Sequence, residues 1–220
     1  MPVFNEEKTL KEIISKVSEI DFVNEIVCVN DGSTDESGMI LDKISRELQG
    51  KIFVIHHKHN TGKGAAVISG LEKINGEFVI IQDADLEYDP SQYGLMLKLF
   101  ENKEVKVVYG SRNINKNPKS SFAFYWGGIF LSVLTNVLYG SNISDESTCY
   151  KMFRTDFLKE LNLKSKGFDF CPEVTAKVLK RKVKIYEVPI SYTPRLHNEG
   201  KKIRWHDGLK AIWTLVKFRF

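Results

Sequence analysis

Two aspartates separated by one residue, Asp83 and Asp85, follow the largely apolar run 78–82. A short apolar run bounded by turn signals is typical of a buried strand in a parallel sheet, and open α/β sheets bind ligands at the carboxyl ends of such strands. Two carboxylates this close are costly to ionise together unless a cation lies between them. Oxygen ligands suit Mg²⁺ or Mn²⁺, which often share their coordination with substrate phosphates. The alternative is a turn in which Asp85 or Asp89 caps the next helix.

Two other turns place polar groups beside glycine. Asp31 precedes Gly32 after a strand-like run, where its carboxylate could accept a hydrogen bond from a base or a ribose hydroxyl, or the turn could simply begin a helix. Lys63 lies between two glycines just before a predicted helix N-terminus, a location that suits phosphate. This second segment is neither a Rossmann fingerprint, since Val67 occupies the third glycine position, nor a P-loop.

The composition is that of one globular domain, or one domain with an appendage. The chain has 220 residues, 42% of them hydrophobic, and a net charge of +4. No long basic tract is interleaved with aromatic residues, which argues against nucleic acid as the partner. The basic excess near the C-terminus fits a membrane surface or a phosphate-bearing substrate. Three cysteines without metal-binding spacing, Cys28, Cys149 and Cys171, indicate reduced thiols in the cytosol.

The elements that must position these residues alternate between strand and helix up to residue 111, which favours a parallel α/β sheet. The expected strands are 25–30, 52–55, 78–82, 105–109, 150–153, 184–188 and 190–193. The expected helices are 7–19, 33–49 with a capping box at its start, 64–74, 90–101, 155–161, 172–181 and 209–218. Residues 2–7 are typical of a loop that enters a helix, with no strand before it.

Residues 120–144 include no charged side chain and could form a helix long enough to cross a membrane. A single crossing would separate the two aspartates from the later motifs. Four polar residues also fall on one face at helical spacing: Ser132, Thr135, Asn136 and Tyr139. We therefore expect an amphipathic helix that lies in the membrane interface. A buried core helix is the alternative.

The C-terminal helix shows a second amphipathic pattern. One side has the apolar residues Leu209, Ile212, Trp213, Val216 and Phe220, and the flanking basic residues are Lys210, Lys217 and Arg219. This pattern is typical of a basic helix on a membrane surface. An ordinary packed terminal helix is the alternative.

The motifs PVFNEE, NDGSTD, NTGKGAA and IIQDADLEYDP occur in this order at successive predicted strand ends. The constellation resembles the family-two glycosyltransferases of the GT-A fold, and later motifs look like the dolichyl-phosphate mannose synthase branch and its bacterial relatives. The resemblance implies a Rossmann-like α/β nucleotide-diphospho-sugar transferase whose mostly parallel central sheet is flanked by helices and lacks the family's first strand. It implies one catalytic domain over 1–220, with a nucleotide-sugar half over 1–112 and an acceptor- and membrane-facing half over 113–220.

The resemblance also implies roles for individual residues. The donor-binding residues would be Pro2, Phe4, Glu6, Asp31, Lys63 and Asp83. The Mg²⁺ or Mn²⁺ ligands would be Asp83 and Asp85, with Glu87 as a further ligand. The acceptor or phosphate-binding residues would be Arg112, Lys151, Arg195, Lys201 and Lys202, the last three on a mobile loop. The synthases read Ser-Gly-Phe-Arg where this chain has Thr148-Cys149-Tyr150-Lys151, and lysine holds phosphate with less directional specificity than arginine.

Three functions remain open from these residues. The first is an inverting, metal-dependent hexosyltransferase, with Asp83, Asp85 and Arg112 as catalytic residues, that moves a sugar from GDP-mannose or a UDP-hexose to a polyprenyl phosphate. It would be peripheral on the cytoplasmic membrane face. The second transfers the sugar to a saccharide hydroxyl in cell-surface polysaccharide synthesis and needs a base, Asp145 or Glu146. The third is a non-catalytic nucleotide-sugar-binding module. The sequence leaves open the donor, the lipid length and the oligomeric state.

Overall fold

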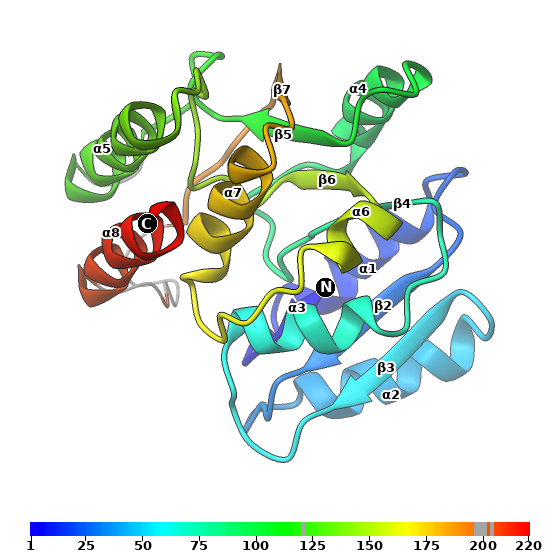
Figure 1. The fold of residues 1–220 in the computed structure, drawn as a ribbon. Helices are drawn as coiled ribbons and strands as arrows, with labels where there is room; N and C mark the ends of the chain where they lie inside the picture. The colour runs from blue at the N-terminus through cyan, green and yellow to red at the C-terminus, as the bar shows by residue number, and fades with distance from the viewer. Residues whose placement is uncertain (120–121, 196–201, 203–204) are drawn as a thin grey trace.

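The structure is a computed structural model of the chain and describes residues 1–119, 122–195, 202 and 205–220. Its strands form two sheets with helices packed around them (Figure 1). The first sheet is parallel, in the order β1 (Pro2–Val3), β2 (Ile26–Asn30) and β3 (Ile52–His56). The second has the order β4 (Phe78–Ile80), β6 (Lys151–Arg154), β5 (Val107–Ser111) and β7 (Ile185–Pro189). In it β6 is antiparallel to both neighbours, whereas β5 and β7 are parallel.

The helices follow the alternation that the sequence predicts. The N-terminal half has α1 (Leu10–Ser18), α2 (Ser37–Glu47), α3 (Lys63–Leu71), the 3₁₀ turns η1 (Pro90–Gln92) and η2 (Lys98–Glu101), and α4 (Tyr93–Leu97) between them. The C-terminal half has α5 (Phe122–Tyr139), α6 (Thr155–Glu160), α7 (Phe170–Lys180) and α8 (Trp205–Arg219). The apolar stripe of α1, with Leu10 and Ile14 fully buried, packs into the core as its periodicity predicts.

One cluster of buried apolar side chains spans both sheets. It includes Val3 in β1, Cys28 in β2, Val107 in β5 and Val174 in α7. Because this core is continuous, the edge of the first sheet and the edge of the second are held in a fixed relation, and residues from the two halves of the chain can form one site.

Several sequence predictions are wrong in detail. Pro2–Val3 is not a loop but a short strand, since both residues pair in parallel with β2. Helix α2 begins at Ser37, not at the expected capping box, because the hydroxyl of Ser33 accepts a hydrogen bond from the backbone N–H of Asn5 at 3.0 Å. Residues 190–193 form no strand apart from an isolated bridge between Tyr88 and Tyr192.

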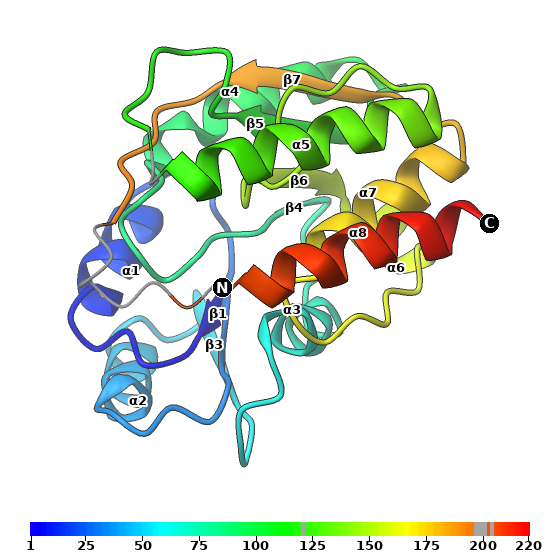
Figure 2. The same cartoon turned by 90° about the vertical axis from the view of Figure 1, so that its left-hand side faces the viewer.

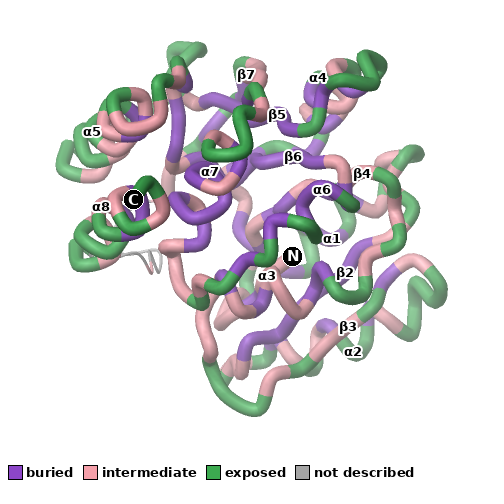
Figure 3. Tube along the Cα trace, viewed as in Figure 1, coloured by how far each residue is buried: buried purple, intermediate pink, exposed green. Residues whose placement is uncertain are grey.

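Helices α5 and α8 lie side by side at the edge of the molecule (Figures 1 and 2), where the hydroxyl of Tyr139 donates a hydrogen bond to the carbonyl of Leu215 at 2.7 Å. The orientation of α5 excludes the alternative prediction that this segment is a buried core helix. Its polar residues Ser132 and Thr135 are buried against the protein, and most of the helix is exposed or half-buried (Figure 3). Of the helices in the described residues, α5 is long and apolar enough to cross a membrane.

Candidate active site

A pocket of about 1170 Å³ lies where the strands of the N-terminal half meet helices α5 and α8. The residues predicted to bind the donor, the metal or the acceptor phosphate line it at eleven positions: Pro2, Phe4, Glu6, Asp31, Lys63, Asp83, Asp85, Glu87, Arg112, Arg195 and Lys202. The same pocket is lined by small and apolar residues of the two helices, namely Ala123, Gly127, Gly128, Leu131, Ala211 and Ile212. Lys201 lies outside the described residues.

Asp83 follows β4 and forms an ion pair with Lys63, the first residue of α3. The ammonium nitrogen of Lys63 is 2.6 Å from Oδ1 of Asp83. Burial would raise the pKa of Asp83, but the charge of Lys63 holds that pKa below its ordinary value. The pair places one positive and one negative group at a helix N-terminus inside the pocket.

Asp85 is buried and has a different environment. Burial, together with the nearby charge of Asp83, raises the pKa of Asp85 to about 7, although Arg195 acts in the opposite direction. Nη2 of Arg195 lies 2.6 Å from Oδ2 of Asp85. The Oδ1 atom accepts a hydrogen bond from the backbone N–H of Glu87 at 3.1 Å. One carboxylate oxygen of Asp85 therefore stabilises the turn, as the alternative interpretation expects, and the other contacts Arg195. The helix-capping alternative fits Asp89, whose Oδ1 accepts from the N–H of Ser91.

The two aspartates suit a divalent cation by their donor chemistry. Asp85 offers carboxylate oxygens in a buried setting and Asp83 in a half-buried one. Burial and repulsion by Asp83 raise the pKa of Asp85, and a nearby divalent cation would offset both effects. No preformed group of three metal-ligating side chains exists among the described residues. Lys63 and Arg195 form ion pairs with these carboxylates.

Glu87, the predicted further metal ligand, contacts the segment after β7, and its role at a metal stays a prediction. Its Oε2 accepts a hydrogen bond from the hydroxyl of Tyr192 at 3.0 Å, and its Oε1 accepts one from the backbone N–H of Arg195 at 2.9 Å. Its backbone carbonyl accepts from the N–H of Thr193 at 2.9 Å. Glu87 therefore anchors the polypeptide that places Arg195 in the pocket. The sequence assigns no role to Tyr192, although in the expected strand 190–193 it shares a face with apolar Ile190, which was the available signal.

Asp31 stabilises the loop before α3. Its Oδ1 accepts from the N–H of Thr61 at 2.9 Å and its Oδ2 from the N–H of Gly62 at 2.7 Å, while Nδ1 of His57 lies 2.7 Å from Oδ1. These bonds outweigh burial and lower the pKa of Asp31. Gly62 has φ of +102°, and a Cβ there would lie 2.4 Å from the carbonyl oxygen of Lys166. The glycine allows the loop to approach a second segment closely.

Arg112 follows β5 and forms a two-pronged ion pair with Asp145. Both contacts, Nε to Oδ2 and Nη2 to Oδ1, measure 2.7 Å. The charge of Arg112 keeps the pKa of Asp145 low against the effect of burial. Glu187 in β7 holds the same turn, because its carboxylate accepts from the backbone N–H groups of Ser144 and Asp145. Asp145 thus contacts Arg112, which lines the pocket, and its predicted catalytic role stays a prediction.

Lys151 does not reach the pocket, which corrects its prediction as a phosphate-binding residue. Its position in the central strand β6 turns the side chain into the core, where it is fully buried. The ammonium group donates to the carbonyl of Glu146 at 2.6 Å and lies 3.9 Å from the ring centroid of Tyr109. Glu146 itself lines the pocket, is 1% exposed, and has an Oε1 without a hydrogen-bond partner among the described residues.

Residues 1–161 match the model of glycosyl transferase family 2. The chain belongs to this family. It is therefore a glycosyltransferase by descent, and the expected family and α/β GT-A fold are confirmed.

Three curated relatives cover essentially the whole chain. A dolichyl-phosphate β-glucosyltransferase of Trichomonas vaginalis is 29% identical over 99% of this chain and 71% of its own length. A UDP-N-acetylglucosamine–dolichyl-phosphate N-acetylglucosaminyltransferase of Methanococcus voltae is 29% identical over 100% and 94%. An undecaprenyl-phosphate mannosyltransferase of Micrococcus luteus is 27% identical over 100% and 96%.

A solved structure shows the same fold at lower identity. Glucosyl-3-phosphoglycerate synthase of Mycobacterium tuberculosis, in a complex with Mn²⁺, UDP-glucose and phosphoglyceric acid, has a TM-score of 0.73 and 18% identity over 99% of this chain and 77% of its own. The likeness establishes the arrangement of strands and helices in which that enzyme binds its nucleotide sugar.

Proposed function

We propose that this protein is a single-domain, inverting hexosyltransferase that uses Mg²⁺ or Mn²⁺ and moves a sugar from a nucleoside-diphosphate sugar to the phosphate of a polyprenyl phosphate. We place it at the cytoplasmic face of a membrane as a peripheral protein. The single observation behind the proposal is that one pocket is lined both by the charged residues after the strands and by α5 and α8, whose outer faces are apolar. The relatives named above act on dolichyl or undecaprenyl phosphate, which supports the acceptor class.

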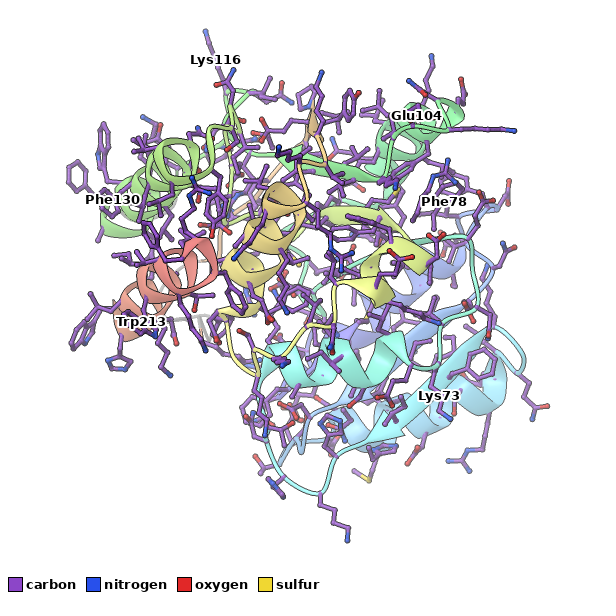
Figure 4. All side chains as sticks on the ribbon, in the orientation of Figure 1. Lys73, Phe78, Glu104, Lys116, Phe130 and Trp213 are labelled. Atoms are coloured by element: carbon purple, nitrogen blue, oxygen red, sulfur yellow. The ribbon has the colours of Figure 1, made fainter. Side chains whose placement is uncertain are left out.

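The outer face of α5 is suited to lipid. The side chains at Phe122, Trp126, Phe130, Val133 and Val137 are 52–80% exposed and recur on one face. On α8, Trp205, Leu209 and Trp213 are 57–73% exposed. Figure 4 shows Phe130 and Trp213 on the side of these helices away from the sheets. A contiguous apolar surface of this kind on two adjacent helices, with tryptophans in it, is typical of a face in contact with a membrane interface.

The chemistry follows from the charges in the pocket. We assign Asp83 and Asp85 to the metal, which when bound would neutralise charge on the donor diphosphate. We assign Lys63 and Arg112, which line the pocket, to the stabilisation of negative charge on the leaving nucleoside diphosphate and on the acceptor phosphate. A phosphate monoester has its second pKa near 6, so it is already a nucleophile at neutral pH. The acceptor oxygen attacks the anomeric carbon opposite the leaving group, which inverts the configuration and requires no catalytic base.

The second candidate function is transfer of the sugar to a saccharide hydroxyl. The position of Glu146 in the pocket is the observation that favours it. A hydroxyl acceptor needs a base, and Asp145 is occupied by Arg112. Glu146 lines the pocket with an unpartnered Oε1, and burial raises its pKa, which suits a base. The first candidate therefore predicts that Glu146→Gln keeps its transferase activity, and the second predicts that this variant loses it.

The test is an assay of purified protein with Mn²⁺, a panel of UDP- and GDP-sugars, and short polyprenyl phosphates in detergent. We expect sugar transfer to the lipid phosphate by the wild type and by Glu146→Gln, and none by Asp85→Asn. A thermal-shift screen with UDP and GDP and their sugars identifies the donor first, because a bound ligand raises the melting temperature. Absence of transfer to every lipid phosphate would contradict the proposal. Transfer to a saccharide hydroxyl instead, lost in Glu146→Gln, would favour the second candidate.

A further inference from the structure

The guanidinium group of Arg195 occupies the centre of the acidic side of the pocket. Its Nη2 is 2.6 Å from Oδ2 of Asp85, and its Nη1 is 3.1 Å from Oε1 of Glu6. Its Nε is 3.5 Å from Oε1 of Glu87. The Arg195 side chain is 19% exposed, and the three carboxylates are 7–12% exposed, so solvent screens these contacts only weakly.

A second cation from the same C-terminal segment joins this cluster. The ammonium group of Lys202 lies 2.7 Å from Oε1 of Glu6 and also donates to the backbone carbonyl of Phe4. Three carboxylates are thus matched by two basic side chains. Without them, mutual repulsion and desolvation would disfavour the charged carboxylates.

The Arg195 contact and a metal contact compete for the same atom. Asp85 has two oxygens: Oδ1 is engaged by the backbone N–H of Glu87, and Oδ2 by Arg195. Guanidinium has donors only and stays charged at all physiological pH values. A divalent cation at Oδ2 would therefore face a fixed positive charge at hydrogen-bond distance, so one of the two must leave.

The backbone of this segment is held independently of the guanidinium group. The N–H of Arg195 and the hydroxyl of Tyr192 both donate to Glu87, and the N–H of Thr193 donates to the Glu87 carbonyl. The Arg195 side chain can consequently leave Asp85 while its Cα stays beside the pocket that Arg112 also lines.

We propose that Arg195 is a resident counter-cation of the metal site, displaced when the metal–nucleotide complex binds and then available to the acceptor phosphate, so that the donor binds before the acceptor. This inference rests on the proposed function for its second half. The first half, competition between Arg195 and a divalent cation, concerns this chain alone and can be tested without donor or acceptor.

The first experiment measures Mn²⁺ binding to the nucleotide-free protein by the electron paramagnetic resonance signal of free Mn²⁺. We expect Arg195→Ala to bind Mn²⁺ roughly tenfold more tightly than the wild type, because the competing ion pair at the buried carboxylate of Asp85 is removed. Arg195→Lys, which keeps the charge, should stay near the wild type. Arg181→Ala is the matched control, since it removes one positive charge from a 42% exposed side chain outside the pocket. Equal or weaker binding by a folded Arg195→Ala would overturn the proposal.

The second experiment measures the binding of farnesyl phosphate by calorimetry, with and without Mn²⁺ and UDP. We expect several-fold tighter binding to the wild type when Mn²⁺ and UDP are present, and weak binding to Arg195→Ala under both conditions. Equal affinity for farnesyl phosphate with and without Mn²⁺–UDP would overturn the binding order. If no phosphate lipid bound at all while Arg195→Ala still gained Mn²⁺ affinity, the counter-cation would stand and the proposed acceptor would fall.

Discussion

Arg112 and Asp145 form a two-pronged ion pair in which both nitrogen–oxygen distances are 2.7 Å, and the backbone N–H of Arg112 adds a third bond to Oδ2 at 2.9 Å. Asp145 is 1% exposed, so its charge is balanced chiefly by this arginine. The pair changes how a mutation of Asp145 must be interpreted. Lost activity would report the position of Arg112 as readily as a missing base.

A double-mutant cycle separates these two meanings. We expect Arg112→Ala to lower kcat/KM by roughly 10²-fold, in the range for removal of one group that stabilises developing charge. Asp145→Ala should cause a similar loss, and the double mutant should lose little more, because Asp145 acts through Arg112. Steady-state kinetics and melting temperatures of the three variants provide the measurement. Additive losses would instead assign Asp145 an independent catalytic role.

The pH dependence of stability tests the state of Glu146. Burial raises the pKa of Glu146 above its ordinary 4.5, so between 4.5 and the raised pKa the folded protein binds more protons at this group than the unfolded chain does. The stability that this group contributes is complete below about pH 4.5 and is lost as the pH rises through the raised value. Glu146→Gln should therefore melt above the wild type at pH 8 and level with it near pH 4. A lower melting temperature than the wild type at pH 8 would indicate an ionised, well-bound Glu146.

Charged substitutions on α5 test the membrane-facing surface. Val133 is 54% exposed and Trp126 is 52% exposed, and neither lines the pocket, so Val133→Asp and Trp126→Glu should change the free energy of unfolding by only about 0.5 kcal/mol. Both should weaken binding to vesicles with anionic lipid in a sedimentation assay. Met39→Glu is the control, because Met39 in α2 is 66% exposed and does not line the pocket. Vesicle binding unchanged by the α5 substitutions would argue against this face.

A substitution at Gly64 tests whether the start of α3 must lie close to the segment that contains Ser165. A Cβ at Gly64 would lie 2.1 Å from the carbonyl oxygen of Ser165, so Gly64→Ala should destabilise the protein by about 1–3 kcal/mol through overpacking and weaken nucleotide binding. Gly94→Ala is the matched control, since nothing lies within 4 Å of a Cβ there; it should be neutral or stabilise by about 0.4–1 kcal/mol. Chemical denaturation and UDP titration measure both. Equal stability of the two variants would show that the backbone yields at Gly64.

The sequence by itself determined the alternation of strands and helices, the family, and the location of Asp31, Lys63 and Asp83 at strand ends or helix starts. These features depend on local periodicity and on turn chemistry, which neighbouring residues specify. Only the tertiary structure decided which way β6 runs and where its side chains point. The motif around Lys151 predicts that it binds phosphate, whereas its position in β6 buries it in the core.

The sequence also could not show which face of α5 packs against the protein, or that Arg195 contacts Asp85. The periodicity of α5 placed Ser132 and Thr135 on one face, but their burial against the protein, which leaves the apolar face outward, follows from packing alone. Likewise, Arg195 is 110 residues from Asp85 in the chain, and their 2.6 Å contact requires the turn after β7 to meet the turn after β4. Contacts between distant segments depend on the whole folded core, and a single sequence has no local signal for them.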